Sequence, residues 1–216
     1  MEIKDKSYYK HARTGMLPFV PKEAKTILEI GCGQGNFSGQ FVKDGIEVWG
    51  VEPDPTAAKF AIEKLFKVFE SAIDEALKYL PDDYFDVIIM NDVLEHLTYP
   101  SEVLKKLKIK LTKEGVTVSS IPNVRYSKNI FNLIFKKDWK YTESGILDNT
   151  HFRFFTKKSI QRLHMDSGYS IQCIKGINRT KSFLFFPFAV LVNILLLCSQ
   201  LDMFYMQYAT VARRNI

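Results

Sequence analysis

The feature that most constrains the fold is a loop with three glycines at alternate positions, EIGCGQGNF at 29–37. It directly follows the short apolar run TILEI at 26–30, which has the composition of a buried β-strand. Apolar residues within 36–43 then recur at helical spacing. Glycines between a strand and a helix let backbone N–H groups approach a ligand closely. The sequence therefore predicts an α/β unit with a binding site at this turn.

The same alternation of strand and helix continues along the chain and predicts a parallel sheet with helices on both faces. The run FDVIIM is almost continuously apolar, as expected for a central parallel strand. Thr156 and Gly168 have the character of a helix N-cap and a helix stop. Strands are predicted at 26–30, 46–52, 67–70, 85–90, 116–121, 169–177 and 206–214, and helices at 36–43, 53–66, 71–80, 95–111 and 156–168.

Length and composition indicate a single domain over residues 1–216, with 46% apolar and 25% charged residues. Two insertions interrupt it: an aromatic, basic segment at about 123–155 and a hydrophobic one at about 181–200. The N-terminal MEIKDKSYYK predicts no secretory signal, and three cysteines without metal-ligand spacing favour a reducing cytoplasm. The net charge of +6 indicates solvated helix faces or an anionic partner, such as a membrane surface or acidic glycan. Basic and aromatic residues do not interleave, which argues against nucleic acid.

The nature of the ligand follows from two acidic residues. Glu52 ends the second predicted strand, about 20 residues after the loop, where a carboxylate binds ribose hydroxyls. The loop lacks the Gly-Lys-Ser/Thr of a P-loop, and its third glycine comes one place too early for a dinucleotide fingerprint. Glu29 would repel a pyrophosphate but attract an ammonium group. These features favour a nucleoside that carries an amino-acid tail.

Glu29, the glycines of 31–35 and Glu52 together resemble the S-adenosylmethionine (SAM) site of class I methyltransferases. FDVIIMNDVLEHL and EGVTVSSIPN resemble the fourth and fifth strands of that family, and the last two predicted strands resemble its C-terminal hairpin. The resemblance covers nearly the whole chain. It implies a Rossmann-like, doubly wound, mostly parallel seven-stranded sheet with a C-terminal antiparallel hairpin.

Three further segments, SIPNVRY, the region of Trp139 and GILDNTHFRFFTKKSIQRL, are similar to a bacterial subgroup associated with surface-glycan biosynthesis. This resemblance implies O-methylation of a sugar hydroxyl in a surface glycan or its lipid-linked precursor. Two alternatives stay open. One is a quinone, lipid or other small-molecule acceptor, and the other is a binding protein with the methyltransferase fold but without turnover.

The family resemblance implies contacts to SAM at the ends of the first four predicted strands. Tyr9 and Arg13 would close over the cofactor from the N-terminal segment. The methionine part would meet Glu29, Gly31, Gly33, Gly35 and Asn91, and the adenosine part would meet Glu52, Pro53, Ala72 and Ile73.

A hydroxyl acceptor benefits from a base that removes its proton, and histidine suits that role near neutral pH. His96 follows the fourth strand at the edge where open α/β folds bind ligands, and His151 lies in the 123–155 insertion. Either histidine could instead be structural. Asp92 and Asp148 are the carboxylate candidates, with Asp92 alternatively orienting His96. No metal-ligand spacing is visible and direct methyl transfer needs no metal, so we expect none.

The insertion also supplies candidate acceptor contacts, because aromatic faces stack on sugars and arginine pairs with carboxylate or phosphate. The alternative is a hydrophobic lid that packs on the sheet. The candidates are Trp139, Tyr141, Arg153 and Phe155.

The apolar segment 183–198 is too short for a membrane span, at about 24 Å as a helix against a hydrocarbon core of about 30 Å. Both of its flanks are predicted strands of one sheet, so the chain must return to the same side. The segment is then a helix packed on the domain or at a homodimer interface, or a peripheral contact with the inner face of the cytoplasmic membrane. Basic residues favour an anionic surface: Lys175, Arg179, Lys181, Arg213 and Arg214.

Overall fold

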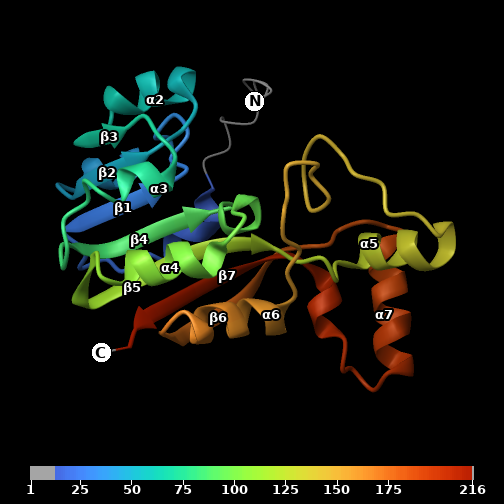
Figure 1. The fold of residues 1–216 in the computed structure, drawn as a ribbon. Coiled ribbons are helices and arrows are strands. Elements are labelled where there is room, and N and C mark those ends of the chain that lie inside the picture. The colour runs from blue at the N-terminus through green and yellow to red at the C-terminus, as the bar shows by residue number, and fades with distance from the viewer. Residues whose placement is uncertain (1–12, 216) are drawn as a thin grey trace.

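The computed structural model describes residues 13–215. One sheet of seven strands runs through them in the order β3-β2-β1-β4-β5-β7-β6, with helices on both faces (Figure 1). Strands β1 to β5 are parallel, and β7 is antiparallel to both β5 and β6. This confirms the predicted sheet and its C-terminal hairpin. The strands are β1 (Thr26–Ile30), β2 (Glu47–Val51), β3 (Lys67–Phe69), β4 (Phe85–Asn91), β5 (Leu111–Pro122), β6 (Tyr169–Arg179) and β7 (Tyr205–Arg214).

The helical elements are short and connect successive strands. They are η2 (Thr14–Phe19), α1 (Gly39–Val42), α2 (Pro55–Ile62), α3 (Ile73–Ala76), η3 (Leu94–His96), α4 (Pro100–Lys108), α5 (Ser127–Phe131), η4 (Asn132–Lys136), α6 (Lys157–Asp166), α7 (Phe185–Leu195) and η5 (Leu201–Phe204).

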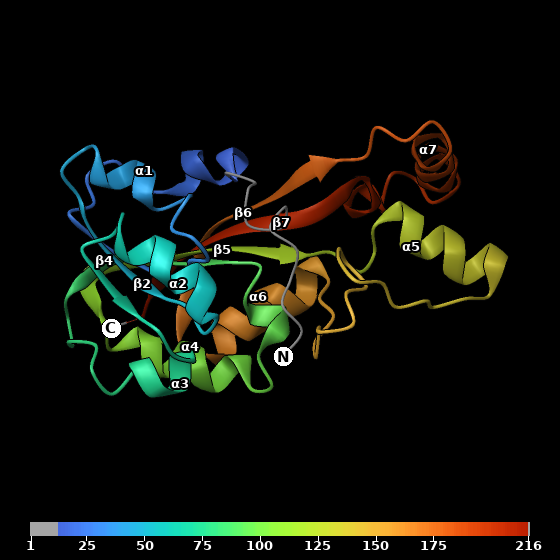
Figure 2. The same ribbon diagram turned by 90° about the horizontal axis from the view of Figure 1, so that it is seen from above.

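The core has two layers, one on each face of the sheet, and β4 contributes to both. Ile88 and Met90 pack with residues of α3, α4 and α6, whereas Val87 and Ile89 pack with residues of η2 and α2. Figure 2 shows the two helical layers on opposite sides of the strands. Burial on both faces explains why the sequence of β4 is almost continuously apolar.

The predicted helix at 95–111 is wrong in extent, because two helices and the start of a strand share this segment. A 3₁₀ turn, η3, ends at His96, and α4 begins only at Pro100, which has no N–H and suits the first helical position. β5 already begins at Leu111, which pairs with Phe85. The predicted helices at 36–43, 53–66 and 71–80 exist but are shorter.

The prediction for α6 is confirmed in detail. Thr156 is its N-cap, and its side chain accepts a hydrogen bond from the backbone N–H of Ser159 at 3.2 Å. The Ser159 hydroxyl oxygen accepts in return from the backbone N–H of Thr156 at 2.8 Å. Gly168 follows the helix with a φ of +85°, which favours glycine.

The two insertions meet in a protrusion, defined as residues 127–136 and 183–201, which extends beyond the edge where the parallel strands end (Figures 1 and 2). Phe131 of α5 contacts Phe188 of α7 edge-to-face at 5.2 Å. Asn193, a polar residue in the apolar segment, is buried and bonds to the backbone of Ala189 and Gln200. Among the described residues, no helix is long and apolar enough to cross a membrane.

Candidate functional site

The glycine loop lies where β1 ends, and its backbone needs glycine at alternate positions. Gly31, Gly33 and Gly35 have φ angles of +67°, +55° and +70°, in the left-handed region. A Cβ at Gly31 would lie 2.9 Å from Cγ2 of Val93, so the loop packs directly against the segment that follows β4. The loop and the end of β4 therefore form one continuous surface at the carboxyl edge of the sheet.

Glu52 braces this loop from the end of β2. Its Oε2 accepts a hydrogen bond from the N–H of Gly33 at 2.7 Å, and its Oε1 accepts from Asp54 at 2.9 Å. Burial raises the pKa of Glu52, and these two backbone donors oppose that rise. The carboxylate lies where the ribose prediction requires it, and its contact with ribose stays a prediction.

Glu29 and Asn91 form a buried polar pair beside the loop, with exposed fractions of 3% and 5%. Oε2 of Glu29 and both amide atoms of Asn91 make no hydrogen bond with the residues that the structure describes. Burial raises the pKa of Glu29 to about 7, although Ser38, Arg13 and Asn91 oppose the rise. Unsatisfied buried groups are costly, so this pair is suited to a polar ligand such as the amino-acid end of SAM.

The residues expected around adenine lie at the ends of β2 and β3. The N–H of Glu52 donates to the carbonyl of Phe69 at 2.9 Å, which joins the two strand ends. Pro53 and Ala72 are exposed there, whereas Ile73 is 5% exposed and belongs to the core. Pro53 and Ala72 are thus accessible to a ligand, and the side chain of Ile73 mainly packs α3 onto the sheet.

Asp92 does not orient His96. Its Oδ2 pairs with Nη1 of Arg13 at 2.5 Å, and its Oδ1 accepts from Ser120 at 2.9 Å and from Gln207 at 2.6 Å. Asp92 therefore ties the N-terminal segment to β5 and β7. Arg13 reaches the carboxyl edge, and its contact with the cofactor stays a prediction, whereas Tyr9 lies outside the described residues.

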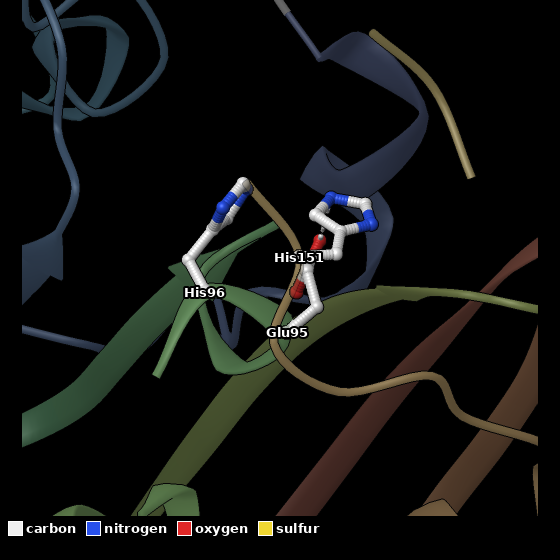
Figure 3. A group of neighbouring side chains, drawn as sticks. All are labelled: Glu95, His96 and His151. Carbon is white, nitrogen blue, oxygen red and sulfur yellow. Dashed lines mark ion pairs between the residues drawn. The ribbon is translucent and has the colours of Figure 1, made fainter. Parts of the chain in front are cut away.

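His96 and His151 come together from distant parts of the chain, with ring centroids 4.6 Å apart (Figure 3). Nδ1 of His96 lies 3.2 Å from the carbonyl oxygen of Thr150, and Nδ1 of His151 lies 3.0 Å from that of Ile146. A carbonyl can only accept, so in the neutral imidazoles each Nδ1 carries the hydrogen and each Nε2 has the lone pair. The two rings are thus held in the same tautomer.

Two neighbours of this pair were not predicted. Glu95 is 1% exposed, and its Oε1 lies 4.0 Å from Nε2 of His151. Thr150 donates through its hydroxyl to Asp148 at 2.6 Å, so Asp148 holds the loop around the histidines. The segment LDNTH carried a signal for this turn, because Asp148 also accepts from the backbone N–H of Thr150 at 2.8 Å, a bond that Asp commonly forms two residues along the chain.

The four residues predicted to contact the acceptor do not lie together in one group. Trp139 and Tyr141 pack around Phe154, at 5.5 and 6.1 Å between ring centroids, and Phe154 lies 6.2 Å from His151. Phe155 instead is 7% exposed and lies in the core. The guanidinium of Arg153 donates to the carbonyl of Thr98 at 2.8 Å. The aromatic neighbour of His151 is therefore Phe154 and not the predicted Phe155.

Comparison with known proteins agrees with this geometry. A family model described as a methyltransferase domain matches residues 2–174. A ubiquinone biosynthesis O-methyltransferase of Aeromonas salmonicida is 27% identical over 162 residues, which cover 71% of this chain and 66% of that protein. An uncharacterized methyltransferase of Mycobacterium leprae is 32% identical over 98 residues, which cover 44% of this chain and 36% of that protein. The matches thus span less than two thirds of the length of these curated relatives.

Solved structures share the fold. A SAM dependent methyltransferase of Archaeoglobus fulgidus superposes with a TM-score of 0.67 at 22% identity, covering 93% of this chain and 92% of that one. A Burkholderia thailandensis 1,6-didemethyltoxoflavin-N1-methyltransferase, solved with its substrate and S-adenosylhomocysteine (SAH), gives 0.62 at 13% identity, with coverages of 98% and 80%. The predicted cofactor and fold class agree with these neighbours. The chain therefore belongs to the methyltransferase domain family and has the fold of SAM-dependent methyltransferases.

Proposed function

We propose that this protein is a SAM-dependent O-methyltransferase that acts on a hydroxyl group of a lipid-anchored acceptor. The observation that carries the proposal is the buried pair of Glu29 and Asn91, whose unsatisfied polar atoms lie beside the glycine loop. SAM, when bound there, supplies an activated methyl group on a sulfonium. Positioning of an acceptor against such a group contributes about 7–11 kcal/mol to catalysis in favourable cases.

The residues that would handle the acceptor follow β4 directly. His96 is partly exposed at the carboxyl edge, and in the neutral ring its Nε2 carries the lone pair, so it is suited to accept the hydroxyl proton. The aromatic group of Trp139, Tyr141 and Phe154 adjoins His151 and offers faces on which a ring can stack. This arrangement supports an acceptor that binds over η3 and the 137–155 loop, beside His96.

The protrusion supports a lipid anchor. It exposes a dense set of apolar side chains at the same sheet edge as the histidines, with Phe183 at 98% and Leu197 at 90% exposure. Exposed apolar clusters of this kind commonly mark interaction sites. The accompanying exposed cations are Lys128, Lys136, Lys137, Lys140, Arg179 and Lys181. We infer that this surface contacts the inner face of the cytoplasmic membrane.

Two of the cations predicted to serve this contact are excluded from it. Arg213 pairs with Glu114 at 2.8 Å and Arg214 with Asp83 at 2.7 Å. Both arginines lie at the end of β7, where the chain has left the protrusion and crossed the sheet. A helix–helix dimer through α7 is the competing use of the apolar surface.

Two acceptor classes share this chemistry. A sugar hydroxyl on a lipid-linked glycan precursor is supported by the resemblance of the SIPNVRY and LDNTHFRFF segments to the glycan-associated subgroup. A hydroxyl of a quinone precursor is supported by the name of the Aeromonas relative. We place the sugar acceptor first, because the aromatic group beside His151 belongs to the segments that carry the glycan resemblance.

The test uses SAM with an isotopically labelled methyl group and membranes from source cells that lack this gene. Wild-type protein and His96→Ala are added in parallel, and mass spectrometry locates the label. If a lipid-linked saccharide is labelled by the wild type but not by His96→Ala, the proposal is supported. If a quinone precursor is labelled, the acceptor is a quinone hydroxyl and not a sugar hydroxyl. SAH binding without label in membrane, glycan or soluble extracts would indicate a binding protein.

A further inference from the structure

We propose that Glu95, His96 and His151 bind a divalent transition-metal ion. Each residue offers one ligand atom, and the three atoms lie within 4.8 Å of one another. Figure 3 shows the two imidazoles and the carboxylate converging from η3 and from the 145–155 loop. This inference rests on the proposed function only for its chemical consequence, because metal binding is measurable without cofactor or acceptor.

The hydrogen bonds of the two histidines point to metal ligation. A histidine ligand typically donates its second ring N–H to a backbone carbonyl or carboxylate, which fixes the ring and its tautomer. Both rings have this arrangement through Nδ1, with Thr150 for His96 and Ile146 for His151. In the neutral ring, Nε2 is therefore the nitrogen with which each histidine would coordinate an ion.

The environment of Glu95 also fits a cation. Its side chain is 1% exposed and its Oε1 lies 4.0 Å from Nε2 of His151, and buried charged groups in proteins are paired or coordinate metals. The backbone carbonyl of Glu95 accepts hydrogen bonds from Phe152 at 2.9 Å and Arg153 at 3.1 Å. These bonds hold the loop of His151 against η3, so the backbone of the whole cluster is fixed.

The distances need only a small closure. Metal–ligand bonds of about 2.1 Å in tetrahedral geometry place ligand atoms about 3.4 Å apart. Nε2 of His151 and Oε1 of Glu95 are 4.0 Å apart and all three ligand atoms lie within 4.8 Å of one another, so side-chain movements of about 1 Å bring them to these distances. Two imidazoles and one carboxylate favour Zn²⁺ or a similar ion over Mg²⁺ or Ca²⁺.

Three protein ligands leave a position for a further oxygen, as catalytic metal sites do. His96 is half-exposed, so that position faces the surface where the acceptor is expected. With His96 as a ligand, the bound ion would take over its role: it would lower the pKa of a coordinated acceptor hydroxyl, whose proton would pass to solvent water. The sequence did not indicate this site because His151 lies far along the chain from the adjacent Glu95 and His96.

The test is a calorimetric titration of the full chain with ZnCl₂, after dialysis against a chelator. Cys173→Ser and Cys198→Ser form the background, since these two thiols are less buried than Cys32 and could bind Zn²⁺ themselves. We expect one bound ion, and at least tenfold weaker binding in Glu95→Gln and in His96→Asn. Glu102→Gln, an exposed carboxylate on α4, is the matched control and should bind as the background protein does.

Absence of binding, or binding that Glu95→Gln and His96→Asn leave unchanged, would overturn the proposal. If the variants do not fold, anomalous scattering from zinc-soaked wild-type crystals tests the site instead. The proposal requires an anomalous zinc peak between the three side chains, and its absence there would overturn the proposal. SAH binding is measured in parallel. Zinc binding without SAH binding would contradict the proposed function but support the metal site. SAH binding without zinc binding would contradict the metal site and leave the proposed function intact.

Discussion

At the scale of single residues, the site is defined by buried polar groups whose desolvation costs free energy. Glu29 lies one residue before the end of β1 and Asn91 ends β4, and these strands are neighbours in the sheet, so their proximity follows from the strand order. Glu52 directly follows β2, on the other side of β1, and its carboxylate binds the N–H of Gly33. Glu29 and Glu52 were predicted from their chemistry and spacing around the glycine loop, whereas Asn91 was predicted from the family resemblance.

The pKa of Glu29 gives a prediction for cofactor binding. Its folded-state pKa of about 7 lies above the ordinary 4.5, so the carboxyl is largely protonated at pH 6 and ionised at pH 8. An ammonium group binds the ionised form, so SAH affinity should rise roughly tenfold between pH 6 and pH 8. Calorimetry at both pH values checks this, and Glu29→Gln should bind weakly and equally at the two. A wild-type affinity independent of pH would contradict the role of Glu29.

The same shift affects stability, with the opposite sign. An acid whose folded pKa is raised favours the folded state below its unfolded pKa, and that advantage is lost as pH rises through the folded pKa. The burial of Glu29 should therefore cost stability progressively between about pH 4.5 and 7. We expect Glu29→Gln to raise the free energy of unfolding at pH 8 more than at pH 5 in urea denaturation. An equal effect at the two pH values would show that the carboxyl titrates normally.

At the scale of elements, the sequence predicted helix boundaries correctly where capping residues alone determine them. Thr156, Ser159 and Gly168 delimit α6 as their residue types suggest. The segment 95–111 failed because its leucines and lysines suit both a helix and the start of a strand. The partner strand decided between them, since β4 pairs with Leu111.

The capping box of α6 provides a stability prediction. Thr156→Ala removes the acceptor for the N–H of Ser159, which should lower the free energy of unfolding by about 1 kcal/mol. Lys157→Ala, an exposed change at the first helical position, is the control and should have little effect. Chemical denaturation measures both. Equal stabilities of Thr156→Ala and wild type would mean that water replaces the cap without cost.

The histidine cluster marks the limit of sequence reasoning at this scale. His96 and His151 were each identified as candidates, but their contact depends on the path of the 137–155 loop. That path is set by Glu95, whose carbonyl binds the backbone of Phe152 and Arg153. No residue pattern in η3 or in the 137–155 loop predicts such a long-range backbone contact.

At the scale of the whole molecule, the glycine loop and the apolar protrusion lie at the same edge of the sheet, where the parallel strands end (Figure 1). This follows from topology, because β5 ends, β6 ends and β7 begins at that edge. Both insertions therefore emerge beside the site and can act on one acceptor.

Membrane contact through the protrusion is testable by flotation with liposomes that contain anionic lipid. Phe183 and Leu195 are 98% and 70% exposed, and we expect the double change Phe183→Glu and Leu195→Glu to abolish flotation. SAH binding should persist, because neither residue is near the glycine loop. Ile62→Glu, an equally nonconservative change at a 55% exposed position on α2, should float as wild type does. Failure of the wild type to float would favour a dimer through α7.

The central claim is that the surface formed by the glycine loop and the end of β4 binds SAM. The most direct measurement is a calorimetric titration of SAH into wild-type protein and into Asn91→Leu, with folding monitored by circular dichroism. We predict saturable binding of one SAH by the wild type, and its loss in a folded Asn91→Leu because a buried amide partner is removed. A folded wild type that does not bind SAH, or an Asn91→Leu variant that binds it equally well, would contradict the account.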